Sequence, residues 1–390
     1  MRNIKNILKS GFLALAIAAP IACEANTKKQ EPTVLLAEAK STKPSKQYVK
    51  IALLLDTSNS MDGLINQAKA QLWDIVNEFS YARCGNDSRP LLQIALYEYG
   101  NDNLSSREGY IRQVIGFISS DLDEISEKLF SLTTNGGEEY CGQVIHTSLR
   151  QLDWGKNKDD LKMIFIAGNE PFTQGKLDYK DAALQAKEKD VIVNTIFCGN
   201  YEQGISTHWK KGAQLTGGDY MAIDHNRQVV HIDTPYDDVI IQLNARLNNT
   251  YISYGHAGAR KKAMQVAQDD NAVELEEAVA VKRAVSKSTG LYNNSSWDLV
   301  DASEDAEFDV SKLEKDELPE ELKGKSSREI EKFIESKKVE RARIQKEIQE
   351  LNAKREAYMA KHQKEEAGEL ENAMITAIKA QAAKKNYSWK

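Results

Sequence analysis

An unbroken apolar run near the start of the chain ends in a cluster of oxygen-bearing side chains, and this run constrains the fold more than any other segment. Ile51-Ala-Leu-Leu-Leu is followed at once by Asp56, Ser58 and Ser60 at alternate positions. A strand without polar residues is typical of a parallel sheet covered on both faces. In open α/β sheets, ligands bind beyond the carboxyl ends of such strands. The sequence therefore predicts that residues 56–60 lie at the ligand-binding edge of an open α/β sheet.

One carboxylate and two hydroxyls at this spacing suit a hard metal ion. Mg²⁺ prefers oxygen ligands in near-octahedral geometry and keeps several waters, so three protein oxygens leave positions open for a partner. We therefore predict a divalent cation, with Mg²⁺ preferred, at Asp56, Ser58 and Ser60. The plainer interpretation is a strand-to-helix turn, because Asp and Ser are also common turn and N-cap residues.

At these residues the chain resembles the von Willebrand factor type A (vWA) family, whose metal-ion-dependent adhesion site begins with Asp-x-Ser-x-Ser after the first strand. The resemblance extends over residues 47–252, which we take as the domain. It implies a doubly wound, mostly parallel sheet flanked by helices that binds protein ligands through a Mg²⁺-type ion. It implies nothing about residues 253–390.

Strand and helix patterns alternate through the same residues, as a parallel sheet with right-handed crossovers requires. The expected strands are Tyr48–Asp56, Leu91–Tyr99, Tyr110–Ile118, Leu161–Ala167, Val191–Phe197 and Tyr220–Ile223. The expected helices are Leu64–Ala82, Asp121–Leu132, Tyr140–Leu152, Tyr179–Lys189, His208–Leu215 and Tyr236–Asn248.

Two loops depart from the family's pattern. The family places a threonine in a Gly-Gly-Thr-like loop and an aspartate after the fourth strand; alignment puts Glu138 and Gly168 at these positions. Thr134 lies close enough for a shifted loop to offer a hydroxyl, and Glu170 follows Gly168 closely, so Glu138, Thr134 and Glu170 are further candidate ligands. Two interpretations remain open: a metal site of altered chemistry with lower affinity for acidic ligands, and a domain that binds without metal.

The motifs of common enzyme classes are missing from the sequence. It contains no G-x-S-x-G elbow, no P-loop, no G-x-G-x-x-G after a strand and no H-E-x-x-H. We therefore expect a binding protein with no catalytic residues and no organic cofactor. The enzymatic alternative is a metal-dependent hydrolase, with Glu138 and Glu170 as acid and base at a metal-bound water.

The first residues have the pattern of an export signal. Arg2, Lys5 and Lys9 precede a short apolar run, which predicts a signal peptide at residues 1–22. Pro20-Ile21-Ala22-Cys23 resembles a bacterial lipobox, so we expect lipidation of Cys23, membrane attachment and a tether at residues 23–46. The expected location is the bacterial cell envelope, as a periplasmic or outer-membrane lipoprotein. The alternative is ordinary secretory cleavage.

Charge and cysteine content limit the partners and cross-links. A net charge of −6 and a pI near 5.7 argue weakly against nucleic acid as the main partner. The protein ligand that we expect is implied by the resemblance to the vWA family. Cys84, Cys141 and Cys198 are odd in number, so at most one intrachain bridge joins them. The expected topology favours a bridge between Cys141 and Cys198, and no C-x-x-C spacing supports zinc.

The character of the chain changes after residue 252. Residues 253–325 read as a linker with partial helix, Arg260–Val285, interrupted at Asp269-Asp270-Asn271, with Trp297 and Leu299 as anchors. Residues 326–386 read as a long coiled-coil-like helix or a helical hairpin through Gly368.

This long helix carries its own functional hypothesis. Its heptad-like seam includes Ile344 and Ile348, but Lys337, Arg341 and Arg355 fall on the same seam. Homo-oligomerisation and packing within the chain both remain open. A metal-free scaffold that interacts through this C-terminal arm is the alternative to binding at the domain.

Overall fold

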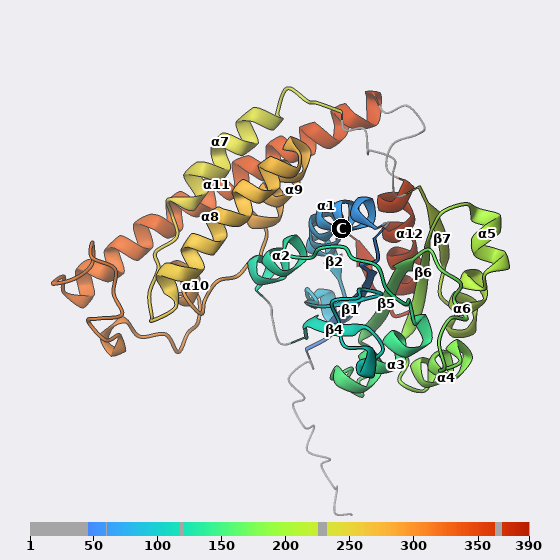
Figure 1. Ribbon diagram of the computed structural model, residues 1–390. Helices are drawn as coiled ribbons and strands as arrows, with labels where there is room; N and C mark the ends of the chain where they lie inside the picture. The colour runs from blue at the N-terminus through green and yellow to red at the C-terminus, as the bar shows by residue number, and fades with distance from the viewer. Residues whose placement is uncertain (1–45, 60, 118–120, 225–231, 363–368, 390) are drawn as a thin grey trace, which may run out of the picture. The chain divides into compact units, whose positions relative to one another are not determined.

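The computed structural model describes residues 46–389, with gaps at 60, 118–120, 225–231 and 363–368 (Figure 1). The expected signal peptide, Cys23, nearly all of the tether, Ser60 and Gly368 lie outside the described residues. Of the helices described, none combines the length and the apolar character needed to cross a lipid bilayer.

A six-stranded sheet with the order β4-β3-β1-β5-β6-β7 forms the centre of residues 48–223. Its strands are β1 Tyr48–Asp56, β3 Leu91–Tyr99, β4 Ile111–Ile115, β5 Leu161–Gly168, β6 Ile192–Cys198 and β7 Tyr220–Ile223. All neighbours run parallel except β4, which pairs antiparallel with β3. β1 is central, pairing Tyr48 with Leu91 and Val49 with Leu161. The predicted doubly wound, mostly parallel sheet is confirmed.

Helices on both faces of the sheet explain why β1 is apolar throughout. Alternate residues of a strand point to opposite faces. Ile51 and Leu53 join the core under one set of helices, whereas Ala52 and Leu54 join the core under the other. The first face is covered by α1 Asp62–Ser80 and α2 Leu122–Phe130; the second is covered by α3 Cys141–Gln151, α4 Tyr179–Glu188 and α6 Trp209–Thr216, with α5 Tyr201–Ser206 beside α6.

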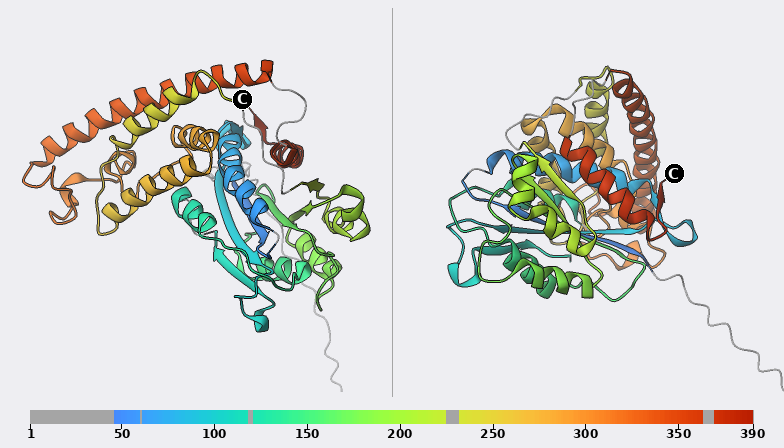
Figure 2. Two further views of the ribbon diagram at one scale, coloured as in Figure 1. Left: turned by 45° about the horizontal axis from the view of Figure 1, so that its top comes forward. Right: turned by 90° about the vertical axis from the view of Figure 1, so that its right-hand side faces the viewer.

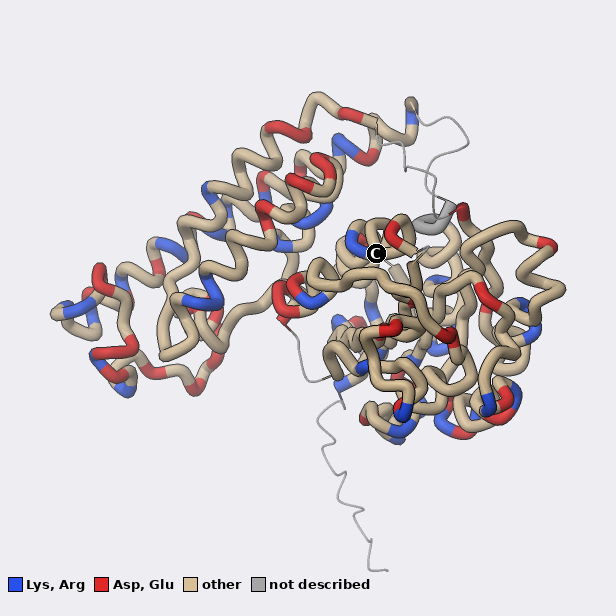
Figure 3. The backbone as a smooth tube through the Cα atoms, in the orientation of Figure 1, with Lys and Arg blue, Asp and Glu red and all other residues tan. Residues whose placement is uncertain are grey.

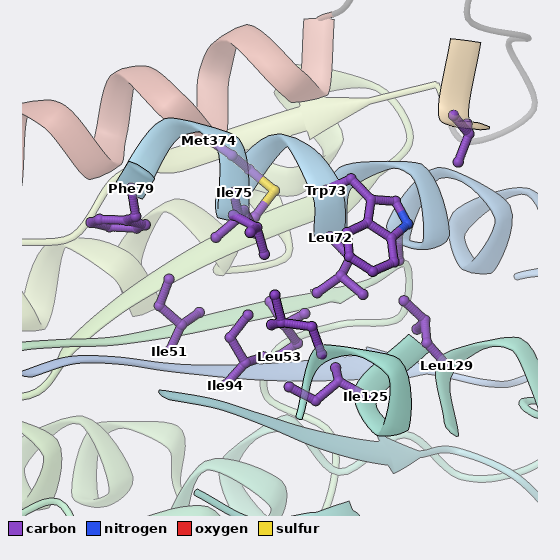
Figure 4. Close-up of a cluster of buried hydrophobic side chains, with 14 of the residues drawn as sticks. Ile51, Leu53, Leu72, Trp73, Ile75, Phe79, Ile94, Ile125, Leu129 and Met374 are labelled. Carbon is purple, nitrogen blue, oxygen red and sulfur yellow. The ribbon is translucent and has the colours of Figure 1, made fainter. Parts of the chain in front are cut away.

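The C-terminal segment folds back onto this sheet. Helix α12 Glu369–Ala383 packs on β7 and α1 (Figures 1 and 2), and β8 Ser388–Trp389 pairs antiparallel with β2 Ala82–Arg83. Met374 of α12 points into the same apolar cluster as Leu72 and Ile75 of α1 (Figure 4). Residues late in the sequence therefore complete a core that begins at residue 49.

Polar contacts fix the position of this C-terminal segment. The buried amide of Gln381 exchanges hydrogen bonds with the amide of Asn194, and its Nε2 also donates to Asp219 Oδ2 at 2.8 Å. The hydroxyl of Tyr387 donates to the carbonyl of Tyr48 at 3.2 Å. Both groups thereby satisfy buried polar atoms of the sheet strands, which apolar packing alone leaves unpaired.

Five further helices and three short 3₁₀ turns make up most of the remaining described chain. The helices are α7 Asp237–Asn248, α8 Gly258–Leu275, α9 Glu277–Lys287, α10 Leu299–Ala302 and α11 Ser327–His362; the 3₁₀ turns are η1 Gly85–Asp87, η2 Ser106–Glu108 and η3 Val310–Lys312. α8 contacts α2, and α9 contacts α1, so this helical region packs directly on the sheet domain. Trp297 and Leu299 are buried, as expected of anchors.

The predicted helix break at Asp269 is wrong, because α8 runs through this residue and ends at Leu275. Asp269 does not cap a helix. Its carboxylate accepts from Arg283 Nε at 2.6 Å and from Lys287 Nζ at 2.8 Å. Arg283 also pairs with Asp123 of α2 at 2.8 Å. A buried charge network therefore holds α8 and α9 against the sheet domain.

The apolar seam of α11 is covered by helices of the same chain. Ile344 and Ile348 are fully buried in the main core. The Arg341 guanidinium, on the same seam, pairs with Asp298 at 2.7 Å and lies 3.9 Å from the centre of the Tyr251 ring. Acidic and basic residues are interspersed along α11 (Figure 3), and many of them are exposed. The structure thus shows the intrachain alternative for this seam.

Candidate functional site

Asp56 closes β1 at the carboxyl end of the sheet and is completely buried. Its Oδ1 accepts a hydrogen bond from the backbone N–H of Ser58 at 2.7 Å, which forms the turn after the strand. The N–H of Thr57 donates to the carbonyl of Tyr99 on the neighbouring strand, so the turn is also fixed from β3. This geometry directs the side chains of Asp56 and Ser58 to the same point.

Two oxygens at this point have no hydrogen-bond partner among the described residues. They are Oδ2 of Asp56 and Oγ of Ser58, whose residue is only 6% exposed. Buried polar atoms in folded proteins are nearly always paired, and an unpaired one marks strain or an absent ion or water. These two atoms are therefore the first indication of a ligand.

Glu139 supplies a second buried carboxylate, which the sequence analysis did not identify. It is 4% exposed and lies in the loop that leads into α3. Gly100 lies beside both carboxyl groups: a Cβ on this glycine would lie 2.8 Å from Cγ of Glu139 and 2.9 Å from Oδ1 of Asp56. Gly100 also has a φ of +78°, which strains other residues. Both the conformation and the space therefore require glycine beside the two carboxyl groups.

The negative charge of either carboxyl group, Asp56 or Glu139, opposes ionisation of the other. Burial raises the pKa of Asp56 above its ordinary value. Burial also raises the pKa of Glu139, and contact with Asp56 raises it further. Two carboxylates this close and this dry do not both ionise unless a cation or a proton compensates them. Without a cation, a proton held between the two carboxyl groups keeps the pair from carrying two charges, and a bound cation would take the place of that proton.

Glu170 contributes a third carboxylate, at the exposed edge of the site. Its backbone N–H donates to Oε2 of Glu139 at 3.4 Å, and its carbonyl accepts from Trp209 Nε1 at 2.8 Å. The charge of Glu170 raises the pKa of both Asp56 and Glu139, although burial is the larger cause for each. Glu170 thus lies within electrostatic reach of the buried pair.

Gly168 cannot be replaced by an aspartate without rearrangement. A Cβ at this position would lie 2.5 Å from the hydroxyl of Tyr99, 3.1 Å from Oδ2 of Asp56 and 3.2 Å from the Trp209 ring. The Tyr99 hydroxyl is held by a hydrogen bond to the carbonyl of Ala167 at 2.9 Å. Two buried aromatic residues therefore fill the space in which the family's second carboxylate is expected.

The other candidate ligands are placed as follows. Glu138 is exposed, and its carboxylate accepts from Gln174 Nε2 at 3.1 Å, so Glu139 rather than Glu138 lies beside Asp56. The hydroxyl of Thr134 donates to Oδ1 of Asp62 at 2.6 Å. Ser60 lies outside the described residues.

The inward position of Glu139 has a signal in the sequence that alignment on Gly136-Gly137 overlooks. The loop that leads into α3 contains neither helix nor strand. Its two adjacent glutamates differ in exposure, with Glu138 exposed and Glu139 buried. Successive side chains of an extended chain point in opposite directions, so either of two adjacent glutamates can be the inward one. The doubled glutamate was therefore the signal for this site, and only the structure could decide between its members.

An oxygen-only site of this kind fits a hard divalent cation. Asp56, Ser58, Glu139 and Glu170 offer carboxylate and hydroxyl oxygens, which Mg²⁺ and Mn²⁺ prefer, and no sulfur or imidazole. Among the described residues, no group of three or more His, Cys, Asp or Glu side chains is arranged to hold a metal on its own. The Ser58 hydroxyl and Oδ2 of Asp56 are therefore needed as ligands. A bound ion would offset the negative charge of Asp56 and so favour ionisation of Glu139.

The predicted disulfide is not formed in this structure. Cys84, Cys141 and Cys198 are all buried free thiols, and burial raises the pKa of Cys141 and Cys198 well above its ordinary value. Sγ of Cys141 lies 3.8 Å from the hydroxyl oxygen of Tyr99. Cys141 otherwise packs as an apolar residue of the core next to the site.

Comparison with known proteins identifies the domain. The family model of the von Willebrand factor type A domain matches residues 50–205. The chain contains a vWA domain. Asp56, Glu139 and Glu170 all fall within the matched part, whereas α7 to α12 lie outside it. No curated protein matches the chain.

Solved structures of similar fold cover less than half of this chain. Matrix protein 1 of the mussel byssus, in a form with a zinc-occupied adhesion motif, is 14% identical over 47% of this chain and 43% of its own, with a TM-score of 0.35. The hypothetical protein BatB from Bacteroides thetaiotaomicron is 17% identical over 45% of this chain and 90% of its own, with a TM-score of 0.34. The pilus adhesin SpaC from Lactobacillus rhamnosus GG is 16% identical over 46% of this chain and 28% of its own, with a TM-score of 0.34. The chain thus spans less than half the length of the matrix protein and of the adhesin.

Proposed function

We propose that this protein is a binding module of the bacterial cell envelope, whose vWA domain holds a divalent cation and binds another protein at the Asp56 end of the sheet. One observation carries the proposal: Oδ2 of Asp56 and Oγ of Ser58 are buried without a partner beside the carboxylate of Glu139. Such a group of oxygen atoms in a dry site favours binding of a cation, which would replace the proton that otherwise keeps the two carboxyl groups from both ionising.

Asp56, Ser58 and Glu139 would hold the ion, with Glu170 at the open side. The bound ion supplies positive charge that a partner's oxygen atoms or waters can coordinate. The chain's own residues orient this charge: the Ser58 N–H fixes one oxygen of Asp56, and the N–H of Glu170 fixes one oxygen of Glu139. The fixed loops around them form the contact surface.

Binding is proposed here in preference to catalysis or a scaffold role of the C-terminal arm. The sequence carries no G-x-S-x-G elbow, P-loop or H-E-x-x-H motif, which is why catalysis is the second choice. The seam of α11 is covered by α7, α9 and α10 of the same chain, so its apolar face is buried and is not exposed to a partner. The envelope location rests on the signal and lipobox pattern that ends at Cys23.

Calorimetry of metal binding tests the first half of the proposal. Mg²⁺ and Mn²⁺ are titrated into the full chain, into Asp56→Ala and into Asp181→Ala, an exposed aspartate on α4. We expect binding heat with the unmodified chain and the α4 control, and none with Asp56→Ala. Absence of heat from the unmodified chain at millimolar metal would refute the metal site.

Crosslinking in intact envelopes tests the second half. The partner is captured by the unmodified chain and identified by mass spectrometry, and the capture is repeated with Asp56→Ala and Asp181→Ala. We expect the partner to be lost only with Asp56→Ala. Equal capture by all three chains would place the partner elsewhere on the molecule.

A further inference from the structure

We infer that the partner presents lysine or arginine side chains to this face, and not the acidic side chain that a metal ion alone would attract; the inference rests on the proposed function of the site. Asp56, Glu139 and Glu170 bring three carboxyl groups to the site, and Glu170 lies exposed at its open side. The open side of the site is therefore acidic.

Further carboxylates lie around the site, on the first residue of α1 and on two loops. Asp62 is exposed and accepts from Thr134 across the site's edge. Asp102 is exposed on the loop after β3, and its Oδ2 would lie 3.6 Å from a Cβ at Gly136. Glu138 is exposed on the loop before α3. We call Asp62, Asp102 and Glu138 the acidic rim.

Few cations of the chain itself neutralise this rim. Within the part of the chain that the structure describes, no ion pair joins a Lys or Arg to the acidic rim or to the three inner carboxylates. Arg107 and Lys176 are the basic residues of the surrounding loops 100–109 and 169–178. Lys69 feels the charge of Asp62, but its ammonium lies over the Phe130 ring, 5.0 Å from its centre.

The acidic rim does not stand alone as evidence of a ligand. The unpaired Oδ2 of Asp56 and Oγ of Ser58 lie in buried residues at its centre. The site therefore combines buried oxygens suited to one metal ion with exposed carboxylates suited to basic side chains.

Complementary charge decides which partners this face accepts. Like charges brought together at an interface cost several kcal/mol, whereas opposite charges accelerate association and set its orientation. A carboxylate approaching the ion must pass the rim and lie against an excess of negative charge. A lysine or arginine can pair with Asp102 or Glu138 while the partner's backbone or amide oxygens reach the ion.

Two short fluorescent peptides of equal length, one of alternating lysine and serine and one of alternating glutamate and serine, test the inference. Their affinity for the full chain is measured by fluorescence anisotropy in Mg²⁺ and in EDTA, at low and high salt. We expect the lysine peptide to bind more tightly in Mg²⁺, and its binding to weaken with salt because exposed charges are screened beyond about 8 Å at physiological ionic strength. Tighter binding of the glutamate peptide in Mg²⁺ would overturn the inference.

Two matched double variants test whether the lysine peptide binds at the acidic rim or is attracted by the overall negative charge of the chain. The double variant Asp102→Asn with Glu138→Gln removes two charges of the acidic rim and leaves the inner carboxylates intact. The control, Asp181→Asn with Glu188→Gln, removes two exposed charges on α4. We expect the rim variant to weaken lysine-peptide binding about tenfold, which is 1.4 kcal/mol, and the control to leave it unchanged. Equal effects of the two variants would also overturn the inference.

The same measurements separate this inference from the metal site. If calorimetry detects no metal but the lysine preference persists in EDTA and depends on the acidic rim, the inference stands and the metal site falls. If metal binds and the glutamate peptide is preferred, the metal site stands and the inference falls.

Discussion

Replacing Ile378 with alanine should destabilise the vWA domain, although this residue lies far beyond the matched part of the sequence. Ile378 is fully buried on α12, in the core cluster that contains β1 and α1. The change removes three carbon atoms, worth about 0.8 kcal/mol each in transfer from water, or roughly 2.4 kcal/mol. The cavity left behind adds to this loss, and large-to-Ala core changes cost about 2–5 kcal/mol in total.

The transfer loss sets the lower end of this range, and the cavity left by three carbon atoms adds to it. A void of about 20 Å³ between α1 and the sheet is lined by Met374, Leu55 and Ile75 among others, but not by Ile378, so it does not change this expectation. We therefore expect a loss of about 3 kcal/mol.

Urea unfolding followed by circular dichroism measures the loss, with Val339→Ala as the control. Val339 is 62% exposed on α11, so its truncation should change the free energy of unfolding by no more than about 0.5 kcal/mol. Hydrogen exchange localises the effect: amides of β7 and α1 should exchange about a hundredfold faster in Ile378→Ala. A loss below about 1 kcal/mol with unchanged exchange in β7 would show that α12 is not part of the domain's core.

Three further changes test other parts of the structure. Gly168→Asp should lower the free energy of unfolding by about 1–3 kcal/mol through overpacking, and by more than Gly168→Ala because it adds a buried charge; an unchanged midpoint of urea unfolding would contradict this. Gln381→Leu should cost about 1–3 kcal/mol in urea unfolding because Asn194 and Asp219 lose their buried partner, whereas an unchanged midpoint would argue against the docked position of α12. Asp269→Asn should cost about 3–5 kcal/mol because buried cations lose their partner. Burial alone would raise the pKa of Asp269, but nearby cations hold it well below its usual range, so its stabilisation is present above about pH 4 and is lost as the pH falls through its lower folded-state pKa. The stability of Asp269→Asn should therefore depend less on pH below about pH 4, and parallel acid-unfolding curves for variant and unmodified chain would refute the assignment.

The sheet, and the edge that carries the candidate metal site, could be predicted because local sequence patterns determine them. The apolar run up to Asp56 indicates a strand covered on both faces, and β1 has the predicted bounds Tyr48–Asp56. Helix α3 begins at Cys141, one residue after the predicted start. Such features depend on residues close together in the sequence, where periodicity is informative.

The remaining features depend on contacts between distant residues. The sequence around Asp269 does not show that Arg283 will pair with it. Without that partner, an aspartate in the middle of a helical pattern indicates a helix break, which is why the prediction was wrong. The pairing of β2 with β8 joins residues about three hundred positions apart, and strands of two residues carry no pattern of their own. The burial of Glu139 depends on the space that Gly100 leaves, which only the folded loop defines.

The return of the C-terminal segment to the first strand also determines when the protein can fold. The Tyr387 hydroxyl bonds to the carbonyl of Tyr48, a separation of 339 positions, and α12 supplies core side chains that no earlier residue replaces. Contacts of such long range slow folding, because the chain loses entropy in closing the loop before the contact stabilises it. The ribosome therefore synthesises residues 57–368 after β1 before the sheet can acquire helix α12. During that interval the apolar face of the sheet is incomplete, which exposes the chain to aggregation.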